Sequence, residues 1–444
     1  MSTDSLGNRL TLQDPCALAA VNDFVEGFIA SEARAVNILA VAETDHSAIV
    51  SACAAAVHMF AETPDAPRHA APFITRARAA AGAATLREQR FVEAVACWVQ
   101  GDLAGAITLH QEQAREHPRD LVSLKLGQYH LFNQGDAPGM LRLALAAAPD
   151  AGDVPYLHGM LAFGYEQCHA LEQAEASARQ AIALCRKEPW AHHALAHVML
   201  TQGRIREGHA FLQEMSATWV GLNSFMLTHN WWHQALLALE LDRHDEVLAL
   251  YDHEVWAVAK DYSQDQVNAV SLLARLELAG VDVGVRWQEL AAYLAPRVAD
   301  QVLPFLDLQY LYGLGRAGLP EADTLLRNIE RHAGSAPQSV RAAWQQVALP
   351  ASRGLLAHAR GDMAGAVEHL GAALPRLLEI GGSHAQRDLF AQVYLDALIR
   401  SGHLAGAQNL LAPQQRSQPE SLRLRRQAGA LDTALGLPSL VQAS

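Results

Sequence analysis

The chain has 444 residues, half of them apolar, and a net charge of −13 from 34 Lys and Arg against 47 Asp and Glu. This acidic balance argues against a nucleic-acid partner, because nucleic acids bind basic faces. No stretch approaches 18 uncharged apolar residues, and the polar start MSTDSLGNRL lacks a secretion-signal pattern, so we expect a cytoplasmic protein without a membrane partner.

The first predicted elements are N-terminal capping helices. Residues 16–84 are apolar and rich in alanine, and this stretch predicts two to four helices that cap the repeats that follow. Two segments, 62–72 and 331–339, combine Pro, Gly and Ser with few apolar residues, and their composition predicts loops.

A repeat of 34 residues begins after the capping region. Gly101, Gly135, His169 and Gly203 follow one another at this interval, each at the end of an apolar helical stretch. The period and the glycine resemble a helix–turn–helix repeat of the tetratricopeptide (TPR) type, in which each unit buries its apolar face only by stacking on its neighbours.

Longer steps of 38 to 43 residues continue the register through Asp242, Gly280, Gly318, Gly361 and Gly402. Runs of alternating β-branched residues are nearly absent, so strands are not expected. The predicted fold is all-α: a TPR-like helix–turn–helix superhelix (α-solenoid) of about nine repeats. We divide it into capping helices over 1–84 and repeats over 85–444, as two parts of one continuous domain.

Two helical segments carry a histidine constellation. His193 and His197 are four residues apart, as are His229 and His233, so each pair lies on one face of its helix. Such pairs chelate a divalent cation or position a general base. The structural alternative is a set of neutral rings that pack between repeats and bond to carbonyls.

Repeat register places these side chains on one wall. Counted from the turns, His193 and His197 take the fifth and ninth positions of their unit, and His229 and Trp232 the second and fifth of the next. In TPR proteins, which the repeat resembles, those positions face the concave groove. We therefore expect the histidines of two consecutive repeats to face a common hollow.

Two further segments contain candidate polar residues. Gly381, Gly382 and Ser383 predict a break before a new helix whose first turn carries Arg387 and Asp388, which suits an anion site or a simple N-cap with a surface ion pair. Asp307 enters an otherwise apolar helix, either as an N-terminal charge or as an acid that faces the groove.

Between His158 and Asp388 the chain resembles the tetratricopeptide repeat protein 38 family. The resemblance rests on PWAHHALAHV (189–198), THNWWHQALL (228–237), VGVRWQEL (283–290), the Asp307 segment and GGSHAQRDLF (381–390). It implies a helical-repeat fold and a shared inner site made of His193, His197, His229, Asn230, Trp232, His233, Asp307, Gln386, Arg387 and Asp388. Leu200, Asn268 and Gln309 replace two acids and a histidine of the family pattern, which disfavours a cation.

These observations predict a binding function. We expect a small polar or anionic molecule to bind at His193, His197, Asn230, Trp232, Gln386, Arg387 and Asp388, with Arg387 as an anion clamp. The catalytic candidates for hydrolysis or proton transfer are His229, His233 and Asp307, although the sequence leaves open whether the chain is an enzyme. No cofactor is predicted; if a metal binds, its ligands are His193, His197, His229 and His233. The alternative is a non-catalytic adaptor that holds a protein or peptide partner in its groove, and a homo-oligomer is compatible with either.

Overall fold

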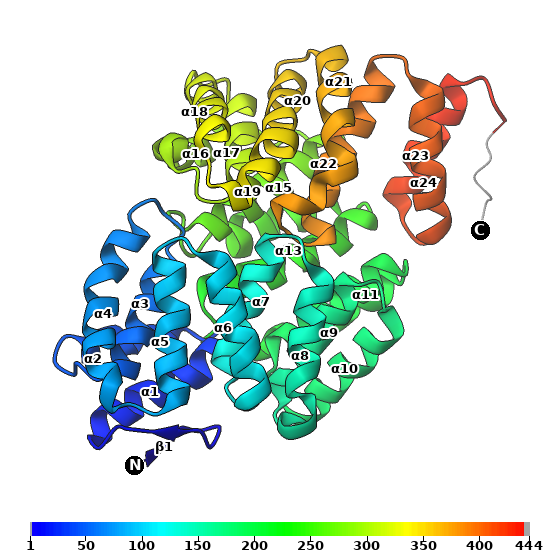
Figure 1. The fold of residues 1–444 in the computed structure, drawn as a ribbon. Coiled ribbons are helices and arrows are strands. Elements are labelled where there is room, and N and C mark those ends of the chain that lie inside the picture. The colour runs from blue at the N-terminus through cyan, green and yellow to red at the C-terminus, as the bar shows by residue number, and fades with distance from the viewer. Residues whose placement is uncertain (1, 439–444) are drawn as a thin grey trace. The chain divides into compact units, whose positions relative to one another are not determined.

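The structure is a computed structural model that describes residues 2–438, and it is built almost entirely from helices (Figure 1). Its one named sheet in that range is a short antiparallel hairpin in which Ser2 pairs with Leu10 and Thr3 with Arg9. The predicted all-α class is therefore confirmed. Across the described range, every helix is too short or too polar to cross a membrane.

The described residues form two compact units. The first covers residues up to Leu195 together with Ala217–Met226, and the second covers Ala196–Ser216 and the residues from Leu227 onward. The first contains β1 (Ser2–Thr3), β2 (Arg9–Leu10), α1 (Pro15–Ile29), η1 (Ala33–Asn37), α2 (Ile38–Ala42), α3 (Ala48–Met59), α4 (Ala66–Ala80), η2 (Ala81–Ala83), α5 (Leu86–Val99), α6 (Leu103–Glu116), α7 (Leu121–Asn133), α8 (Ala137–Ala151), α9 (Pro155–Gln167) and α10 (Leu171–Leu184).

The second unit holds the later repeats. It contains α12 (Ile205–Met215), α14 (His244–Leu250), η4 (Tyr251–Val255), α15 (Ser263–Leu278), α16 (Arg286–Leu294), η5 (Ala295–Ala299), α17 (Pro304–Arg316), α18 (Glu321–Ser335), α19 (Gln338–Ala343), η6 (Trp344–Ala348), α20 (Leu349–Ala359), α21 (Met363–Ala373), η7 (Leu374–Ile380), α22 (His384–Arg400), α23 (Leu404–Ser417) and α24 (Leu422–Ala434). Three elements contain residues of both units: α11 (Pro189–Thr201), η3 (Ser216–Thr218) and α13 (Ser224–Glu240).

The predicted turns are confirmed by the backbone. All nine positions have φ between 55° and 87°, in the left-handed region: Gly101, Gly135, His169, Gly203, Asp242, Gly280, Gly318, Gly361 and Gly402. At the first of them the backbone N–H of Asp102 bonds to the carbonyl of Cys97 at 2.8 Å, which closes α5. The Asp102 carboxylate then accepts from the N–H of Gly105 at 2.9 Å and caps α6. A Gly-Asp pair thus ends one helix and starts the next.

Helix hairpins that follow one another in sequence pack together within each unit, as in a TPR-like α-solenoid. The core of the second unit includes Trp232, Trp344, Tyr251, Tyr310 and Tyr312, all almost fully buried. Small residues let the helix pairs approach closely elsewhere, since alanines fill many of the buried positions.

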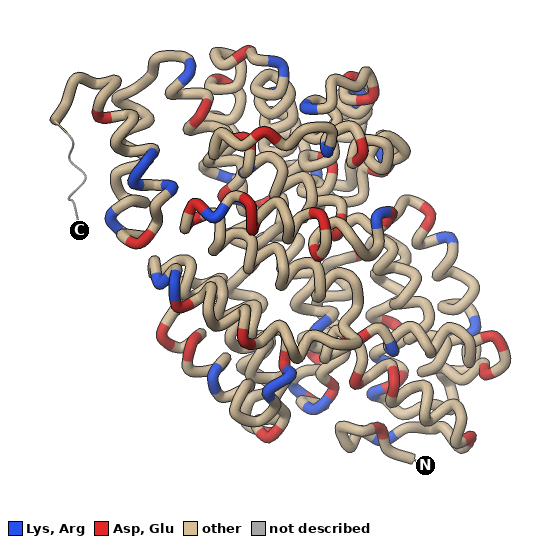
Figure 2. The backbone as a smooth tube through the Cα atoms, turned by 180° about the vertical axis from the view of Figure 1, so that it is seen from behind, with Lys and Arg blue, Asp and Glu red and all other residues tan. Residues whose placement is uncertain are grey.

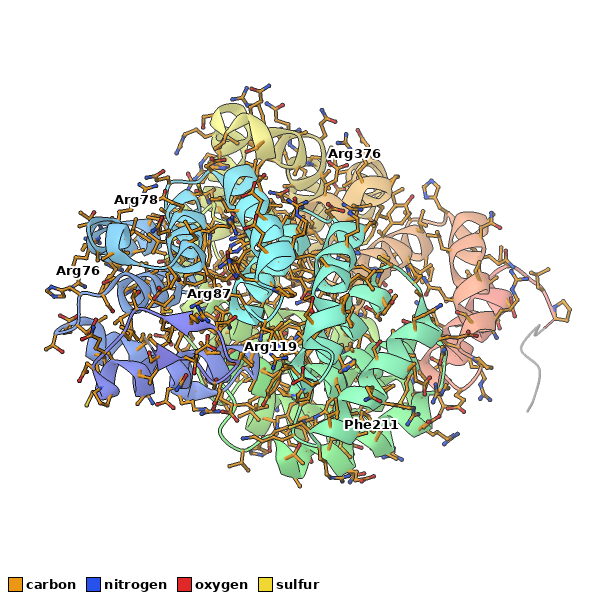
Figure 3. The ribbon with its side chains drawn as sticks, turned by 60° about the horizontal axis from the view of Figure 1, so that its bottom comes forward. Arg76, Arg78, Arg87, Arg119, Phe211 and Arg376 are labelled. Atoms are coloured by element: carbon orange, nitrogen blue, oxygen red, sulfur yellow. The ribbon has the colours of Figure 1, made fainter. Side chains whose placement is uncertain are left out.

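Basic and acidic residues are interspersed along the backbone (Figure 2). The first unit contains a buried ion pair: the Arg87 guanidinium donates to the carboxylate of Asp120 at 2.7 Å, and both side chains are less than 10% exposed. Arg119, labelled with Arg87 in Figure 3, pairs instead with the exposed Asp153 at 2.6 Å. Such a buried pair must be complete to be tolerated, because either charge alone would lack compensation.

The two predicted loops are largely helical, and this part of the prediction is wrong. Helix α4 begins at Ala66 and continues through Pro72, while α18 extends to Ser335. Pro67 stands in the first turn of α4, where its missing N–H costs nothing. Four α-helices, α1 to α4, precede residue 84, within the predicted number of capping helices. The boundary at 84/85 stays a prediction.

Candidate functional site

The two histidine pairs lie on α11 and α13, and each helix has a polar cap before its first turn. The Glu188 carboxylate accepts from the backbone N–H of Ala191 at the start of α11. Burial raises the pKa of Glu188 to about 8, against the lowering effect of that bond. On α13, Asn223 Oδ1 accepts from the N–H of Met226 at 2.9 Å. These caps fix where each helix begins and hence which face the histidines occupy.

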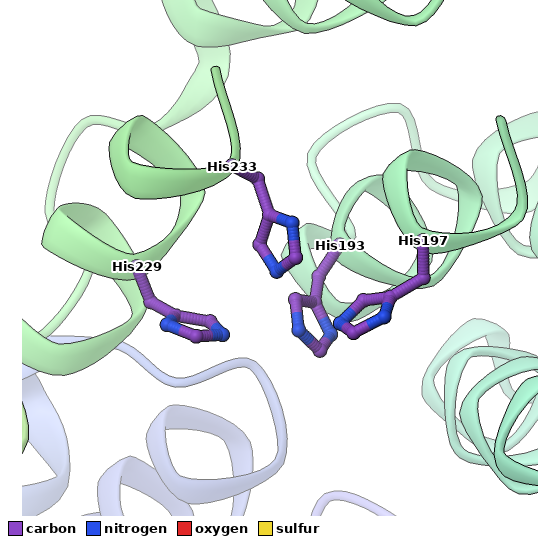
Figure 4. A group of neighbouring side chains, drawn as sticks. All are labelled: His193, His197, His229 and His233. Carbon is purple, nitrogen blue, oxygen red and sulfur yellow. The ribbon is translucent and has the colours of Figure 1, made fainter. Parts of the chain in front are cut away.

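The structure brings the four histidines together, and we call His193, His197, His229 and His233 the histidine cluster (Figure 4). One ring nitrogen from each lies within 4.8 Å of those of the other three. The ring centroids of His197 and His233 are 4.4 Å apart, and those of His229 and His233 are 4.8 Å apart. All four side chains are at most 2% exposed. His197, His229 and His233 belong to the second unit, and His193 lies one turn before His197 on the same helix.

The orientation of the His229 ring is set by an amide. Asn268 on α15 donates through Nδ2 to the Thr228 hydroxyl at 3.4 Å, which directs its Oδ1 toward His229. That oxygen lies 3.0 Å from Nδ1 of His229, so Nδ1 carries the proton and donates. The Thr228 hydroxyl in turn donates to Asp265 Oδ1 at 3.2 Å. The other ring nitrogen, Nε2, therefore presents a lone pair.

Burial keeps His229 neutral. It lowers the pKa of this imidazole to about 3, against the opposing effect of the Asn268 bond. The Trp232 ring stacks on His229 with centroids 5.1 Å apart and planes 11° apart. Trp232 is itself fully buried and belongs to the core of the second unit, so it packs against and supports the histidine. Its role as a ligand-binding residue stays a prediction.

Neighbouring polar residues on the same helices have different roles. His192 Nε2 donates to the carbonyl of Arg186 at 2.9 Å, and its Nδ1 accepts from the Trp219 indole at 3.2 Å. His192 is therefore a structural residue outside the histidine cluster. Asn230 is fully buried, and within residues 2–438 neither atom of its amide has a hydrogen-bond partner. A buried amide of this kind is a candidate to bond a ligand.

Asp307, in the first turn of α17, is 1% exposed and accepts from Gln301 at 3.2 Å. Burial raises its pKa well above the usual value, which favours the protonated acid. The group of possible metal ligands in the described residues contains the four histidines and not this acid. Its catalytic role stays a prediction.

The GGS segment forms the expected helix start. Ser383 caps α22. Gln386 Oε1 accepts a hydrogen bond from the Ser383 backbone N–H at 2.8 Å, which completes a capping box. Arg387 donates to the carbonyl of Gly382. Asp388 pairs with the buried Arg275 at 3.0 Å. These contacts assign structural roles to three predicted ligand residues, whose binding of an anion stays a prediction.

Sequence reasoning did not select Thr228, Asp265 or Arg275, and it treated Asn268 only as a departure from a family pattern. One signal was present: Asp265 and Asn268 are three residues apart on α15 and so share a face. The sequence does not show how α15 is rotated about its axis, so it does not show that this face lies against α13.

Comparison with family models gives no match. Among solved structures, the chain is similar to human IFIT1 in a dimer with m7Gppp-AAAA, with 13% identity over 93% of this chain and 92% of that one and a TM-score of 0.43. The chain is also similar to a monomeric IFIT1 mutant with Gppp-AAAA, with 12% identity over the same shares of both chains and a TM-score of 0.42. A structure of Naa15/Naa10 bound to HypK-THB gives 12% identity over 95% of this chain and 67% of that chain, with a TM-score of 0.26. These likenesses concern helical folds alone.

Proposed function

We propose that this TPR-like protein binds a divalent transition-metal ion, Zn²⁺ first, through the four imidazoles of the histidine cluster. The observation that carries the proposal is the convergence of four buried ring nitrogens within 4.8 Å of one another. Tetrahedral zinc with Zn–N bonds of about 2.0–2.1 Å needs nitrogens about 3.4 Å apart. Side-chain shifts of about 1 Å would close the cluster around the ion.

The contacts behind the cluster support a metal role. Metal-bound histidines donate their second ring N–H to a carbonyl or carboxylate, which fixes the tautomer and orients the ring. Asn268 makes this bond with His229, and Thr228 and Asp265 hold Asn268 in place. A packing role alone does not require the lone pair of His229 to be directed in this way.

Charge balance accounts for the small anionic molecule that the sequence predicts. Neutral imidazoles leave both positive charges of the ion uncompensated, and the cluster contains no carboxylate. Burying such charge is costly, so an additional anionic ligand on the metal is favoured. The small polar or anionic molecule is therefore proposed to bind as a fifth, exchangeable ligand, for which the four-imidazole site would expand to five-coordination. A metal held by the four imidazoles would supply Lewis-acid activation of a bound water, the chemistry that hydrolysis needs.

Metal titration tests the proposal. Protein stripped with a chelator is titrated with Zn²⁺ against a chromophoric competitor, and we expect one ion per chain. His233→Ala and His197→Ala should each weaken binding about 100-fold or more, because each removes one of four ligand bonds. His192→Gln is the matched control, since it changes a buried histidine of α11 whose nitrogens bond elsewhere. Absence of stoichiometric binding, or equal loss in the control, would reject the metal site.

A further inference from the structure

A second candidate site lies in the second unit, and its lining shares no residue with the histidine cluster. Helices α15, α22 and α24 line a cavity of about 280 Å³. Three guanidinium groups reach its wall, from Arg275, Arg423 and Arg426. This volume is near the lower end of the range for small-molecule pockets.

Each arginine is held by a carboxylate outside the cavity lining. Arg423 donates through Nε and Nη2 to Glu240 Oε1 at 2.9 and 2.8 Å. Arg275 pairs with Asp388 at 3.0 Å, and Arg426 pairs with Asp242 at 2.9 Å. Arg275 also donates to the Ser271 hydroxyl and the Ala385 carbonyl, and Arg426 to the Ala279 carbonyl. A guanidinium has five N–H groups, so each arginine keeps N–H groups beyond those that these bonds use.

Two residues of the lining offer hydrogen-bond acceptors. The carboxylate of Asp396 lines the cavity and accepts from His358 Nε2 at 2.8 Å and from Arg400 at 3.4 Å. Burial alone would raise the pKa of Asp396. The hydrogen bond from His358 and the nearby charges outweigh burial, so the net pKa is lowered and the acid is ionised. Gln427 also lines the cavity, and its Oε1 is buried with no hydrogen-bond partner among residues 2–438.

The three arginines that line the cavity are each paired with a carboxylate. Four arginines face four carboxylates: Arg275, Arg400, Arg423 and Arg426 against Glu240, Asp242, Asp388 and Asp396. A dianion such as a phosphate would leave excess negative charge in this partly buried place. A ligand with one negative and one positive or hydrogen-donating end adds no net charge. Leu278, Ala279 and Ala430 are the apolar residues of the lining, and Gln392 also lines the cavity.

We propose that this cavity binds a zwitterionic amino acid. Its carboxylate would lie against the arginine donors, because the planar guanidinium fork matches a carboxylate. Its ammonium would donate to Asp396 and to Gln427 Oε1, and an aliphatic side chain would contact Leu278 and the two alanines. The proposal does not depend on a metal at the histidine cluster.

Calorimetric titration of the metal-free full-length protein with each standard L-amino acid tests this assignment. We expect saturable binding of at least one amino acid with an aliphatic side chain, at one molecule per chain. Arg426→Gln should weaken that binding about tenfold or more, because it removes a charged donor to the carboxylate. Arg426 is 47% exposed, so the variant is expected to fold. Arg416→Gln removes the same charge from an exposed position on α23 and should bind like the parent.

Ligands that lack one of the two charged groups of an amino acid test the carboxylate contacts and the ammonium contacts separately. The amino alcohol that lacks the carboxylate should bind the parent and Arg426→Gln equally weakly. The N-acetylated acid, which lacks the ammonium, should also bind weakly. Inorganic phosphate serves as the dianionic probe. The proposal is overturned if no amino acid binds, if phosphate binds more tightly than every amino acid, or if Arg426→Gln and Arg416→Gln have the same effect.

Discussion

Asn268 Oδ1 lies 3.0 Å from His229 Nδ1, and this contact between α15 and α13 fixes the proton on one side of the ring. Nε2 of this tautomer carries the lone pair and no proton. An oriented tautomer of this kind is what a metal-binding imidazole requires.

Replacing Asn268 tests that requirement. Asn268→Ala removes the acceptor of the His229 N–H, and we expect zinc affinity to fall about 10- to 100-fold, the usual cost of losing an outer-shell partner. Asn268→Asp should retain or strengthen binding, because a carboxylate accepts the same bond and adds negative charge near the ion. Competition with a chromophoric chelator measures both. Equal affinity in Asn268→Ala and the parent would show that the contact does not orient a ligand.

Zinc should also stabilise the fold. A ligand that binds only the folded state raises the free energy of unfolding by RT ln(1 + [L]/Kd), about 2.7 kcal/mol at a hundred times Kd. Thermal unfolding with and without zinc measures this effect, and chelator should reverse it. In His233→Ala the zinc-dependent rise should be nearly lost. An unchanged rise in that variant would place the stabilising ion elsewhere.

Acidification should destabilise the first unit through His110. Burial lowers the pKa of this imidazole to about 3, from 6.5 in the unfolded chain. Between about pH 3 and pH 6.5 the unfolded chain therefore binds a proton on this imidazole that the folded chain does not bind. The free energy of unfolding is at its full value above pH 6.5 and falls as the pH decreases. At pH 5 the loss from one such group is about 2 kcal/mol.

The pH dependence of urea unfolding in His110→Gln checks this assignment. The slope of stability between pH 5 and 7 should decrease relative to the parent, although His130, whose ring lies 5.6 Å away and whose pKa is also lowered by burial, still contributes. The same substitution at the exposed His403 is the control. If both variants keep the parental slope, His110 is not a source of acid sensitivity.

The repeat turns offer a test that isolates backbone conformation. Gly101 has φ of +80° and Gly334 lies in α18, and an added Cβ at either would meet nothing within 4 Å. Gly101→Ala should destabilise by about 1–2 kcal/mol, because an L-residue is strained in the left-handed region. Gly334→Ala should stabilise by about 0.5–1 kcal/mol through the unfolded-state entropy. Chemical denaturation compares them, and a neutral Gly101→Ala would refute the turn assignment.

The turns could be predicted because each depends on one local feature, a residue at positive φ at the end of an apolar helix. The convergence of the histidine pairs also followed from sequence, since i, i+4 spacing and repeat register fix a face. Asn268 and the arginine cavity could not be derived in this way. They depend on how α15 is rotated against α13 and on how α24 meets α22, which side-chain packing decides. The adaptor alternative and the resemblance to the tetratricopeptide repeat protein 38 family stay predictions.

X-ray absorption at the zinc edge of the zinc-loaded protein is the most direct measurement of the central proposal. We predict a first shell of nitrogen or oxygen atoms at about 2.0–2.1 Å with the multiple-scattering signature of imidazole rings, and no sulfur at about 2.3 Å. That signature should lose one ring in His229→Ala. A sulfur-containing shell, or a shell of oxygen atoms without imidazole, would contradict a zinc site in the histidine cluster.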